Sequence, residues 1–184
     1  MVDKIFEKLN NWITGYTPGE YRDKSHFKYY QENLWNYIYG LREDLLQKDE
    51  LTEFQKEFLD TVFYTGRIYR IQNYKKNKKY IEEMNYGQSW SYDIEGVSDV
   101  TNLHQDFLLI IGYVENGINL INLLKFFCEE GNEDKIIEKY ERYIKEHEIV
   151  APTLYRNIID VKIANKENLK EWEQLDSVPS SKYM

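Results

Sequence analysis

The stretch DFLLIIGYV, residues 106–114, decides the fold class of this chain. Its nearly unbroken apolar run is typical of a β-strand that is buried on both faces. A half-exposed strand would alternate apolar and polar residues, and a membrane span would need about 20 apolar residues. The stretch therefore predicts a strand that lies inside a packed sheet.

Other segments rich in β-branched and aromatic residues flank this strand and predict further strands. They are RIYRIQ (67–72) and YGQSWSYDI (86–94) before it, and EIVAP (148–152) and YRNIIDVKI (155–163) after it. Asn116-Gly117 predicts a tight turn directly after the buried strand. The next segment, 118–127, fits a strand or a helix, and its period does not separate the two.

Helices are predicted mainly in the first third of the chain. Segments 2–13 and 26–47 place apolar residues at helical spacing. Thr52 and Gln55 match a capping box at the start of a third helix. Segments 133–145 and 166–175 are further predicted helices.

The order of these elements predicts the fold class. Helices come first and strands later, which favours an α+β fold over alternating βαβ units. We expect an N-terminal helical lobe, 1–64, and a core, 65–184, which together make one compact domain.

Composition limits the classes of partner. The chain of 184 residues has 24 Lys and Arg against 32 Asp and Glu, a net charge of −8, which argues against general nucleic-acid or membrane binding. Its one cysteine, Cys128, excludes an intrachain disulfide and indicates a reducing compartment. The start of the chain has no secretory signal, so we expect a cytoplasmic protein. His104 and His147 lack partners at metal-ligand spacing, so we predict no metal site.

Three short motifs carry the candidate chemistry. They are an arginine within a strand signal (Arg70), a Ser-x-Ser strand start (Ser89 and Ser91), and a Glu-x-Glu pair before an aliphatic run (Glu146 and Glu148). Residues i and i+2 of a strand share one face, which would put the two glutamates about 6.5 Å apart with the residue between them facing away. We therefore predict that all three motifs line one cleft between sheets.

In this order, the motifs resemble those of the ADP-ribosyltransferases of the arginine–serine–glutamate class. That family carries an aromatic-arginine strand, a Ser-x-Ser strand, and a Glu-x-Glu strand followed by aliphatic residues and often proline. EHEIVAP (146–152) is very similar to the third element, and LLIIGYVENGINL (108–120) resembles the segment before it. The resemblance covers residues 66–163 and implies mixed sheets that form an NAD cleft.

The resemblance implies roles for four cofactor-binding residues. Arg70 would form a fork onto the pyrophosphate of NAD, which a guanidinium suits better than an ammonium does. Ser89 would hold Glu148 in place by a hydrogen bond, and Ser91 lies beside it on the same strand. Trp90 stands where the family more often has a small residue; it either stacks on nicotinamide or packs in the core, and we favour the core.

The resemblance also implies a reaction. Glu148 would bind a ribose hydroxyl and face the anomeric carbon, and Glu146 would act on the incoming nucleophile. The chain would be a mono-ADP-ribosyltransferase that uses NAD as substrate, releases nicotinamide and modifies a host or target protein. A glutamate at position 146 favours arginine as the acceptor. By analogy with the family, a small effector of bacterial or bacteriophage origin that works in the bacterial cytoplasm is expected.

Other readings of the same residues stay open. Each motif alone fits a solvated face, a turn or a surface ion pair. The fold could have lost its chemistry and serve as an acidic protein-binding or inhibitor module, or water could replace the acceptor in an NAD glycohydrolase. The basic cluster Lys75–Lys79 fits an exposed turn or a steering patch for phosphate. Tyr140 and Tyr143 either contact the target or pack inward.

Overall fold

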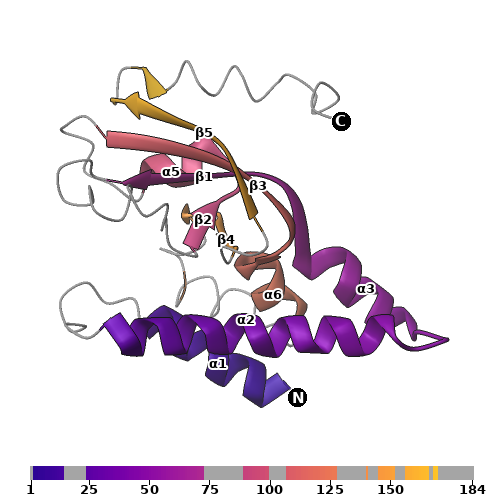
Figure 1. Cartoon of the computed structure of the whole chain (residues 1–184). Coiled ribbons are helices and arrows are strands. Elements are labelled where there is room, and N and C mark those ends of the chain that lie inside the picture. The colour runs from indigo at the N-terminus through magenta and orange to yellow at the C-terminus, as the bar shows by residue number, and fades with distance from the viewer. Residues whose placement is uncertain are drawn as a thin grey trace. The chain divides into compact units, whose positions relative to one another are not determined.

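The computed structural model describes residues 2–14, 24–72, 89–99, 107–127, 140, 145–151, 156–165 and 168–169 (Figure 1). The chain divides into two compact units, Met1–Val62 and Phe63–Met184, whereas the predicted lobe boundary followed residue 64. The lysine cluster, Cys128, His104 and Tyr143 lie outside the described residues, as do nearly all of the predicted helices 133–145 and 166–175.

The first unit is helical. Its elements are α1 (Val2–Thr14), α2 (Lys24–Leu46) and α3 (Glu53–Val62). Helices α1 and α2 pack against each other, and Lys4 Nζ lies 5.1 Å from the ring centroid of Tyr37. The buried side chains are mostly large and apolar: Ile5, Leu9, Trp12, Leu34, Trp35, Ile38, Phe58 and Val62. The prediction of three amphipathic helices is confirmed.

The predicted capping box at the start of α3 is also confirmed. Gln55 N donates to Thr52 Oγ1 over 3.3 Å, and Thr52 N donates to Gln55 Oε1 over 3.1 Å. The pair satisfies two backbone donors that a helix start leaves without intrahelical partners.

The described part of the second unit is a small closed β-barrel with two short helices. Its strands are β1 (Phe63–Gln72), β2 (Ser89–Ser91), β3 (Phe107–Asn119), β4 (Glu148–Val150) and β5 (Arg156–Ala164), and its helices are α5 (Ile94–Asp99) and α6 (Leu120–Phe126). The strand order is β1-β2-β4-β3-β5, and β1 also pairs with β3, so the first four strands close into a ring. All described pairings are antiparallel. The predicted α+β class is confirmed at this level.

Strand β3 is the centre of the second unit. It pairs with β1 along one edge and with β5 and then β4 along the other. Most of its side chains are buried, as the run at 106–114 predicts. Segment 118–127, whose sequence fits a strand or a helix, contains both: β3 ends at Asn119 and α6 begins at Leu120.

The predicted tight turn at Asn116-Gly117 is wrong, because β3 continues through it as a β-bulge. Tyr64 pairs with Gly117 and Gly66 pairs with Val114, so one residue of β1 faces two of β3. Asn116 takes up the extra length with a φ of 58°, and its N–H donates to Thr65 Oγ1 over 3.1 Å. Asn-Gly favours left-handed backbone, which a bulge needs as much as a hairpin turn does.

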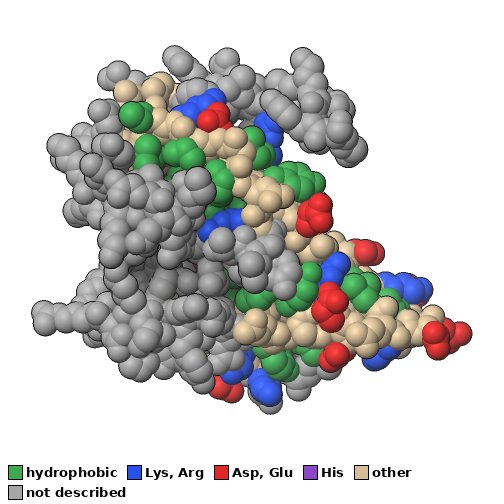
Figure 2. Space-filling model, in the orientation of Figure 1, with side chains coloured by type: hydrophobic (Ala, Val, Ile, Leu, Met, Phe, Trp, Pro, Cys, Tyr) green, Lys and Arg blue, Asp and Glu red, His purple; other side chains and the backbone are tan. Residues whose placement is uncertain are grey.

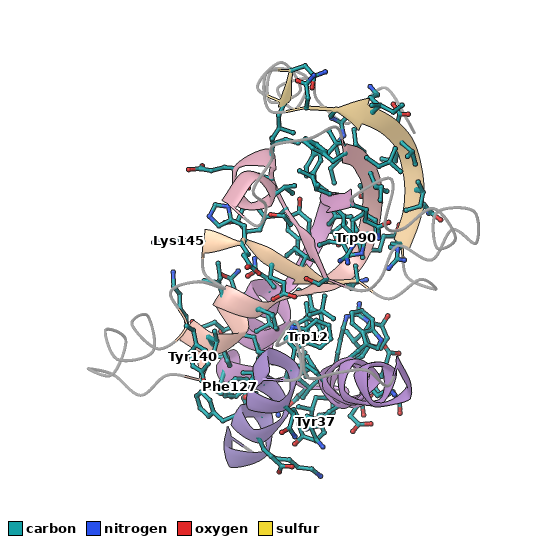
Figure 3. All side chains as sticks on the ribbon, turned by 90° about the vertical axis from the view of Figure 1, so that its left-hand side faces the viewer. Trp12, Tyr37, Trp90, Phe127, Tyr140 and Lys145 are labelled. Atoms are coloured by element: carbon teal, nitrogen blue, oxygen red, sulfur yellow. The ribbon has the colours of Figure 1, made fainter. Side chains whose placement is uncertain are left out.

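The ring of strands has two apolar faces. One cluster draws side chains from β1, β2, β3 and β4 together with Ala151, and we call this the inner face: Ile68, Trp90, Leu108, Ile110, Val114, Ile149 and Ala151. Trp90 lies among these strands in Figure 3. The other cluster, the outer face, gathers strand residues under α5 and Leu169: Tyr69, Phe107, Leu109, Ala164, Ile94, Val97 and Leu169.

Strand β5 carries the most exposed apolar side chains of the described sheet. Figure 2 shows apolar surface along the upper part of the molecule, where Figure 1 places β5. The exposed residues of this strand are Ile158, Ile159, Val161 and Ile163. From residue 159 to residue 163 the strand alternates apolar and polar side chains, with Asp160 and Lys162 between the three apolar residues, so one face of β5 is apolar although it is exposed.

Candidate functional site

The sheet register brings the three motifs together on adjacent strands. Tyr69 of β1 pairs with Ser91 of β2, and Ser91 pairs with Glu148 of β4. The same β2–β4 pairing opposes Ser89 to Val150 and Trp90 to Ile149. We call these three residue pairs of β2 and β4 the motif ladder.

The prediction that all motif side chains line one cleft needs correction. Residues opposite each other in a ladder point to the same face, so Ser91 and Glu148 share the outer face with Tyr69. Arg70 follows Tyr69 and therefore begins on the inner face, where its partner on β3 is Ile110. Sequence spacing determines which residues of one strand share a face, but it does not determine the register between strands.

Arg70 nevertheless contacts the motif ladder. Its Nη1 donates to the carbonyl oxygen of Ser89, the first residue of β2. Its Nε is buried and has no hydrogen-bond partner among the described residues. Arg70 thus links the first motif to one end of the second through the backbone rather than through the serine hydroxyl.

Arg156, which sequence reasoning missed, lies at the same end of the ladder. It is only 7% exposed, and its Nη1 donates to the carbonyl oxygen of Ala151, next to the end of β4. Burial, and secondarily the charge of Arg70, lowers the pKa of Arg156 to about 10. Its only sequence signal is an arginine that opens a strand, and a surface residue gives the same signal.

Trp90 packs in the core, as we favoured. It is 3% exposed and belongs to the inner-face cluster. The guanidinium carbon of Arg156 lies 4.7 Å from its ring centroid. This cation–π contact fixes the position of the guanidinium over the ring. The Trp90 side chain therefore packs beneath the motif ladder on the inner face. A ring buried in this way is not accessible for stacking on nicotinamide.

The two glutamates occupy different backbone environments. Strand β4 begins at Glu148, which is 3% exposed, whereas Glu146 and His147 lie in the turn before it. His147 has a φ of 49°, so the extended Glu-x-Glu geometry that the sequence predicts is wrong. The Ser91 hydroxyl donates to the carbonyl oxygen of Glu146 over 2.8 Å and ties this turn to the second motif.

An aspartate–histidine pair holds the turn in place. His147 Nδ1 lies 2.8 Å from both carboxylate oxygens of Asp93. Because a carboxylate only accepts hydrogen bonds, Nδ1 carries the proton. The His147 ring also stacks on Tyr92, with ring centroids 4.8 Å apart. Burial, then the charges of Asp93 and Glu95, raise the pKa of Tyr92.

Asp93 also caps α5. The N–H of Gly96 donates to Asp93 Oδ1 over 2.8 Å. An aspartate side chain that accepts from the first turn of a helix satisfies a backbone donor that has no intrahelical partner. One carboxylate therefore joins the start of α5 to the turn that carries Glu146.

Gly96 explains why α5 approaches the turn so closely. A Cβ at this position would collide with Ser91 Oγ and would lie 2.6 Å from the Glu146 carbonyl oxygen and 2.8 Å from His147 Cβ. Only glycine allows this contact without a shift. Asp93 and Gly96 closely follow the Ser-x-Ser motif, but nothing in the sequence alone couples them to the glutamates.

Tyr140 is the remaining predicted contact residue that the structure describes. Tyr140 is buried, which fits inward packing rather than target contact. Within the described ranges, no helix is long and apolar enough to cross a membrane, and no three His, Cys, Asp or Glu residues lie close enough to hold a metal ion.

In comparisons with known proteins, no protein-family model, no curated protein and no solved structure matches this chain.

Proposed function

We propose that this chain is a mono-ADP-ribosyltransferase whose NAD site lies on its sheet, although the described pairings are all antiparallel rather than the mixed sheets that the resemblance implies. It binds NAD, releases nicotinamide and transfers ADP-ribose to a macromolecular acceptor, a protein arginine. By analogy with the family that the motifs resemble, it works as an effector in the cytoplasm of a bacterial cell.

One observation carries the proposal: the motif ladder has opposite charges at its two ends. At the end formed by Ser89 and Val150, two guanidiniums contact the backbone, and we call this the guanidinium end. At the end formed by Ser91 and Glu148, a carboxylate lies buried, and we call this the carboxylate end.

The spacing of the two ends suits a dinucleotide. Ser89 and Ser91 are two residues apart in the sequence. Two residues of a strand span about 6.6 Å. In NAD, one ribose and its exocyclic methylene separate the pyrophosphate from the anomeric carbon that carries nicotinamide. This spacing along the strand is comparable to that ribose. Because the two arginines start on the inner face and Glu148 lies on the outer face, the ribose would have to pass around the end of β2 to bring the anomeric carbon near Glu148.

The carboxylate end supplies what the reaction needs. As the bond between the anomeric carbon and nicotinamide breaks, its electron pair leaves with nicotinamide and the ribose gains oxocarbenium character. A carboxylate about 4 Å away stabilises that charge by at most about 4 kcal/mol at an effective dielectric constant of about 20. Glu148 is preorganised for this role by burial and strand pairing.

Glu146 is the candidate base. The acceptor nitrogen forms the new bond to the anomeric carbon, and its proton passes to the Glu146 carboxylate. Base assistance of this kind contributes about 10²- to 10⁴-fold in rate. The Ser91 hydroxyl and the Asp93–His147 pair hold the turn that carries Glu146.

The test is to incubate the purified chain with NAD labelled in its adenosine half and to follow both nicotinamide and protein-bound label. A small guanidine such as agmatine serves as a defined acceptor, and a bacterial lysate serves as the source of protein acceptors. Nicotinamide release with label on agmatine or on a protein is the expected result. Release with free ADP-ribose alone would indicate an NAD glycohydrolase. No release from wild-type protein under any of these conditions would leave only the binding-module reading.

A further inference from the structure

We propose that β5 is a self-complementary edge through which two copies of this chain pair as antiparallel strands. Strand β5 stands last in the sheet order, and among the described residues it pairs with β3 alone. Its other side is therefore an open edge of the described sheet. An open edge presents a row of backbone N–H and C=O groups to which another strand can add. Pairing through this edge does not depend on the proposed enzymatic activity.

The side chains on one face of β5 are apolar and exposed. Val161 pairs with Ile110, a member of the inner-face cluster, and Ile163 pairs in the same way with Leu108, another member. Residues opposite each other in a ladder share a face, so the apolar inner face continues from β3 onto β5. Ile159 lies two residues before Val161 and therefore on the same face. Ile159 and Ile163 are 50% and 67% exposed, so water reaches this part of the apolar face.

The opposite face of the same segment carries one acid and one base. In the single chain these two side chains pair with each other, because Lys162 Nζ lies 3.0 Å from Asp160 Oδ2. The Val161 N–H also donates to Asp160 Oδ1 over 2.8 Å. The carboxylate thus satisfies a backbone donor and a cation of its own strand while no second strand is present. Segment 159–163 is apolar on one face and carries balanced charges on the other.

One register makes two copies of this segment complementary. In an antiparallel pair with its twofold axis at Val161, Ile159 of each copy faces Ile163 of the other. On the opposite face, Asp160 of each copy faces Lys162 of the other. Apolar side chains then meet apolar ones, and opposite charges meet twice because of the symmetry. Such an isologous contact closes on itself as a dimer rather than extending into a fibre.

Other registers are disfavoured by the same residues. A twofold axis at Asp160 would set two aspartates opposite each other, and an axis at Lys162 would set two lysines opposite each other. Like charges directly opposite each other destabilise a strand pair. An offset of one residue would bring the apolar face of one copy against the charged face of the other. Charge complementarity therefore selects both the partner, which is a second copy of this chain, and the register.

The size of the contact predicts a weak and reversible dimer. Segment 159–163 is short, whereas stable interfaces bury about 1,200–2,000 Å². The net charge of −8 on each copy also opposes association. Pairing exchanges the contact between Asp160 and Lys162 within one chain for the same contact between chains, so these charges set the register more than the affinity. The gain comes from strand hydrogen bonds and from covering the apolar side chains.

The experiment follows the average mass of the full chain by sedimentation equilibrium as its concentration rises. We expect wild type to go from the mass of one chain toward that of two. Asp160→Lys and Lys162→Asp each place like charges opposite each other at two positions of the dimer. Each variant alone should therefore stay monomeric at concentrations where wild type dimerises.

An equimolar mixture of these two variants tests the register. Asp160→Lys presents two lysines and Lys162→Asp presents two aspartates, so each variant repels itself and complements the other. The mixture should form heterodimers, and a chain that carries both substitutions should dimerise as wild type does. A mixture that stays monomeric where wild type dimerises would overturn the proposal.

Glu53→Lys and Lys56→Asp are the matched controls, because they change the net charge by the same amounts within an exposed ion pair on α3. Both should dimerise as wild type does. A wild-type chain that is monomeric at every concentration, or Asp160→Lys that dimerises as wild type does, would overturn the proposal. If the charge variants do not fold, Ile163→Lys decides in their place. It alters an exposed side chain and sets a charge against an isoleucine of the second copy, so undiminished dimerisation of that variant overturns the proposal.

Discussion

The guanidinium end and the carboxylate end of the motif ladder are built in different ways. At the guanidinium end, long side chains from β1 and β5 reach the backbone of β2 and the residue after β4. At the carboxylate end, short contacts hold a turn: a serine hydroxyl on a carbonyl, and an aspartate on a histidine. The first end therefore depends on sheet register, and the second depends on side-chain contacts to one turn from residues 54 and 55 positions away in the sequence.

This difference shows how three residue pairs can separate opposite charges. The positive charges start on the inner face and the buried carboxylate lies on the outer face, so the β2–β4 backbone lies between them. A cation and an anion on one face would neutralise each other at close range.

The largest expected effect is at the carboxylate end. Glu148→Gln removes the charge that stabilises the oxocarbenium ion while keeping the size of the side chain. We expect nicotinamide release to fall by about a thousandfold, which corresponds to about 4 kcal/mol in the barrier. Steady-state nicotinamide release measures this loss, and circular dichroism checks the fold.

Glu146→Gln is the matched variant for that measurement. It removes the same charge from the turn rather than from the strand, so NAD hydrolysis should persist while transfer to agmatine falls by about 10²-fold or more. Nicotinamide release by Glu148→Gln at the wild-type rate would refute the role of the buried carboxylate. Equal losses of release in both variants would show that the two glutamates act as one unit.

The second effect concerns the rigidity of the carboxylate end. Gly96→Ala introduces a Cβ within 2.8 Å of three groups, one of them the Glu146 carbonyl oxygen. We expect a loss of about 2–3 kcal/mol in the free energy of unfolding, because overpacked sites force neighbours to shift. Urea denaturation measures the loss.

Gly40→Ala is the control for the glycine substitution. Gly40 lies within α2, and a Cβ there meets nothing within 4 Å. Alanine should therefore raise stability by about 0.5–1 kcal/mol through its helix propensity. If Gly96→Ala raises the free energy of unfolding as Gly40→Ala does, the close packing of α5 on the turn is contradicted.

The sequence predicts the elements of the fold better than their connections. The apolar run at 106–114 and the capping box at Thr52 carry their own local physics, and both predictions are confirmed. The Asn116-Gly117 turn is wrong because left-handed backbone serves a bulge and a hairpin equally. Closure of four strands into a ring depends on long-range pairing of β1 with β3, which no local pattern specifies.

In the candidate site too, the sequence predicts the local elements better than the contacts between them. Motif order predicts that Arg70, Ser89 and Glu148 belong together, and the register places their strands side by side. The prediction that Ser89 holds Glu148 is wrong, because the register sets Ser91 opposite Glu148 and Ser89 opposite Val150. The face on which Arg70 starts depends on the pairing of Tyr69 with Ser91, and an offset of one residue would reverse it. Arg156 and Asp93 were missed because their contacts are tertiary and their residue types are common on surfaces.

The third prediction tests the guanidinium end by pH. The pKa of Arg156 is lowered to about 10 by burial and by Arg70. Below that pH the guanidinium is already charged, so the affinity for ADP-ribose should be flat between about pH 7 and 9. Above it, binding must take up a proton, and the affinity should fall by up to about tenfold per pH unit. Calorimetric titrations across this range measure the profile.

Arg156→Gln serves as the reference for that profile, because tyrosine ionisation affects both proteins alike. The difference between the two profiles isolates the guanidinium. A wild-type profile that runs parallel to that of the variant above the pKa of Arg156 would mean that ADP-ribose does not contact this residue.

The smallest effect tests the aspartate–histidine pair that holds the turn. Asp93→Asn keeps an N-cap for α5, because asparagine caps helices about as well as aspartate does. It removes the charge-assisted contact with His147, so we expect a loss of about 1 kcal/mol in unfolding free energy and a fewfold loss in transfer to agmatine. Asp93→Ala removes the cap as well and should lose about 1 kcal/mol more.

Asp160→Asn is the matched control for Asp93→Asn. Asp160 Oδ2 lies 3.0 Å from Lys162 Nζ in a partly exposed pair on β5. Exposed pairs contribute about 0–1 kcal/mol, so its loss should lower stability only slightly and leave transfer unchanged. If Asp93→Asn affects stability but not the ratio of transfer to hydrolysis, the pair supports α5 alone. A selective loss of transfer instead ties the pair to Glu146, because that turn is the structure the two share.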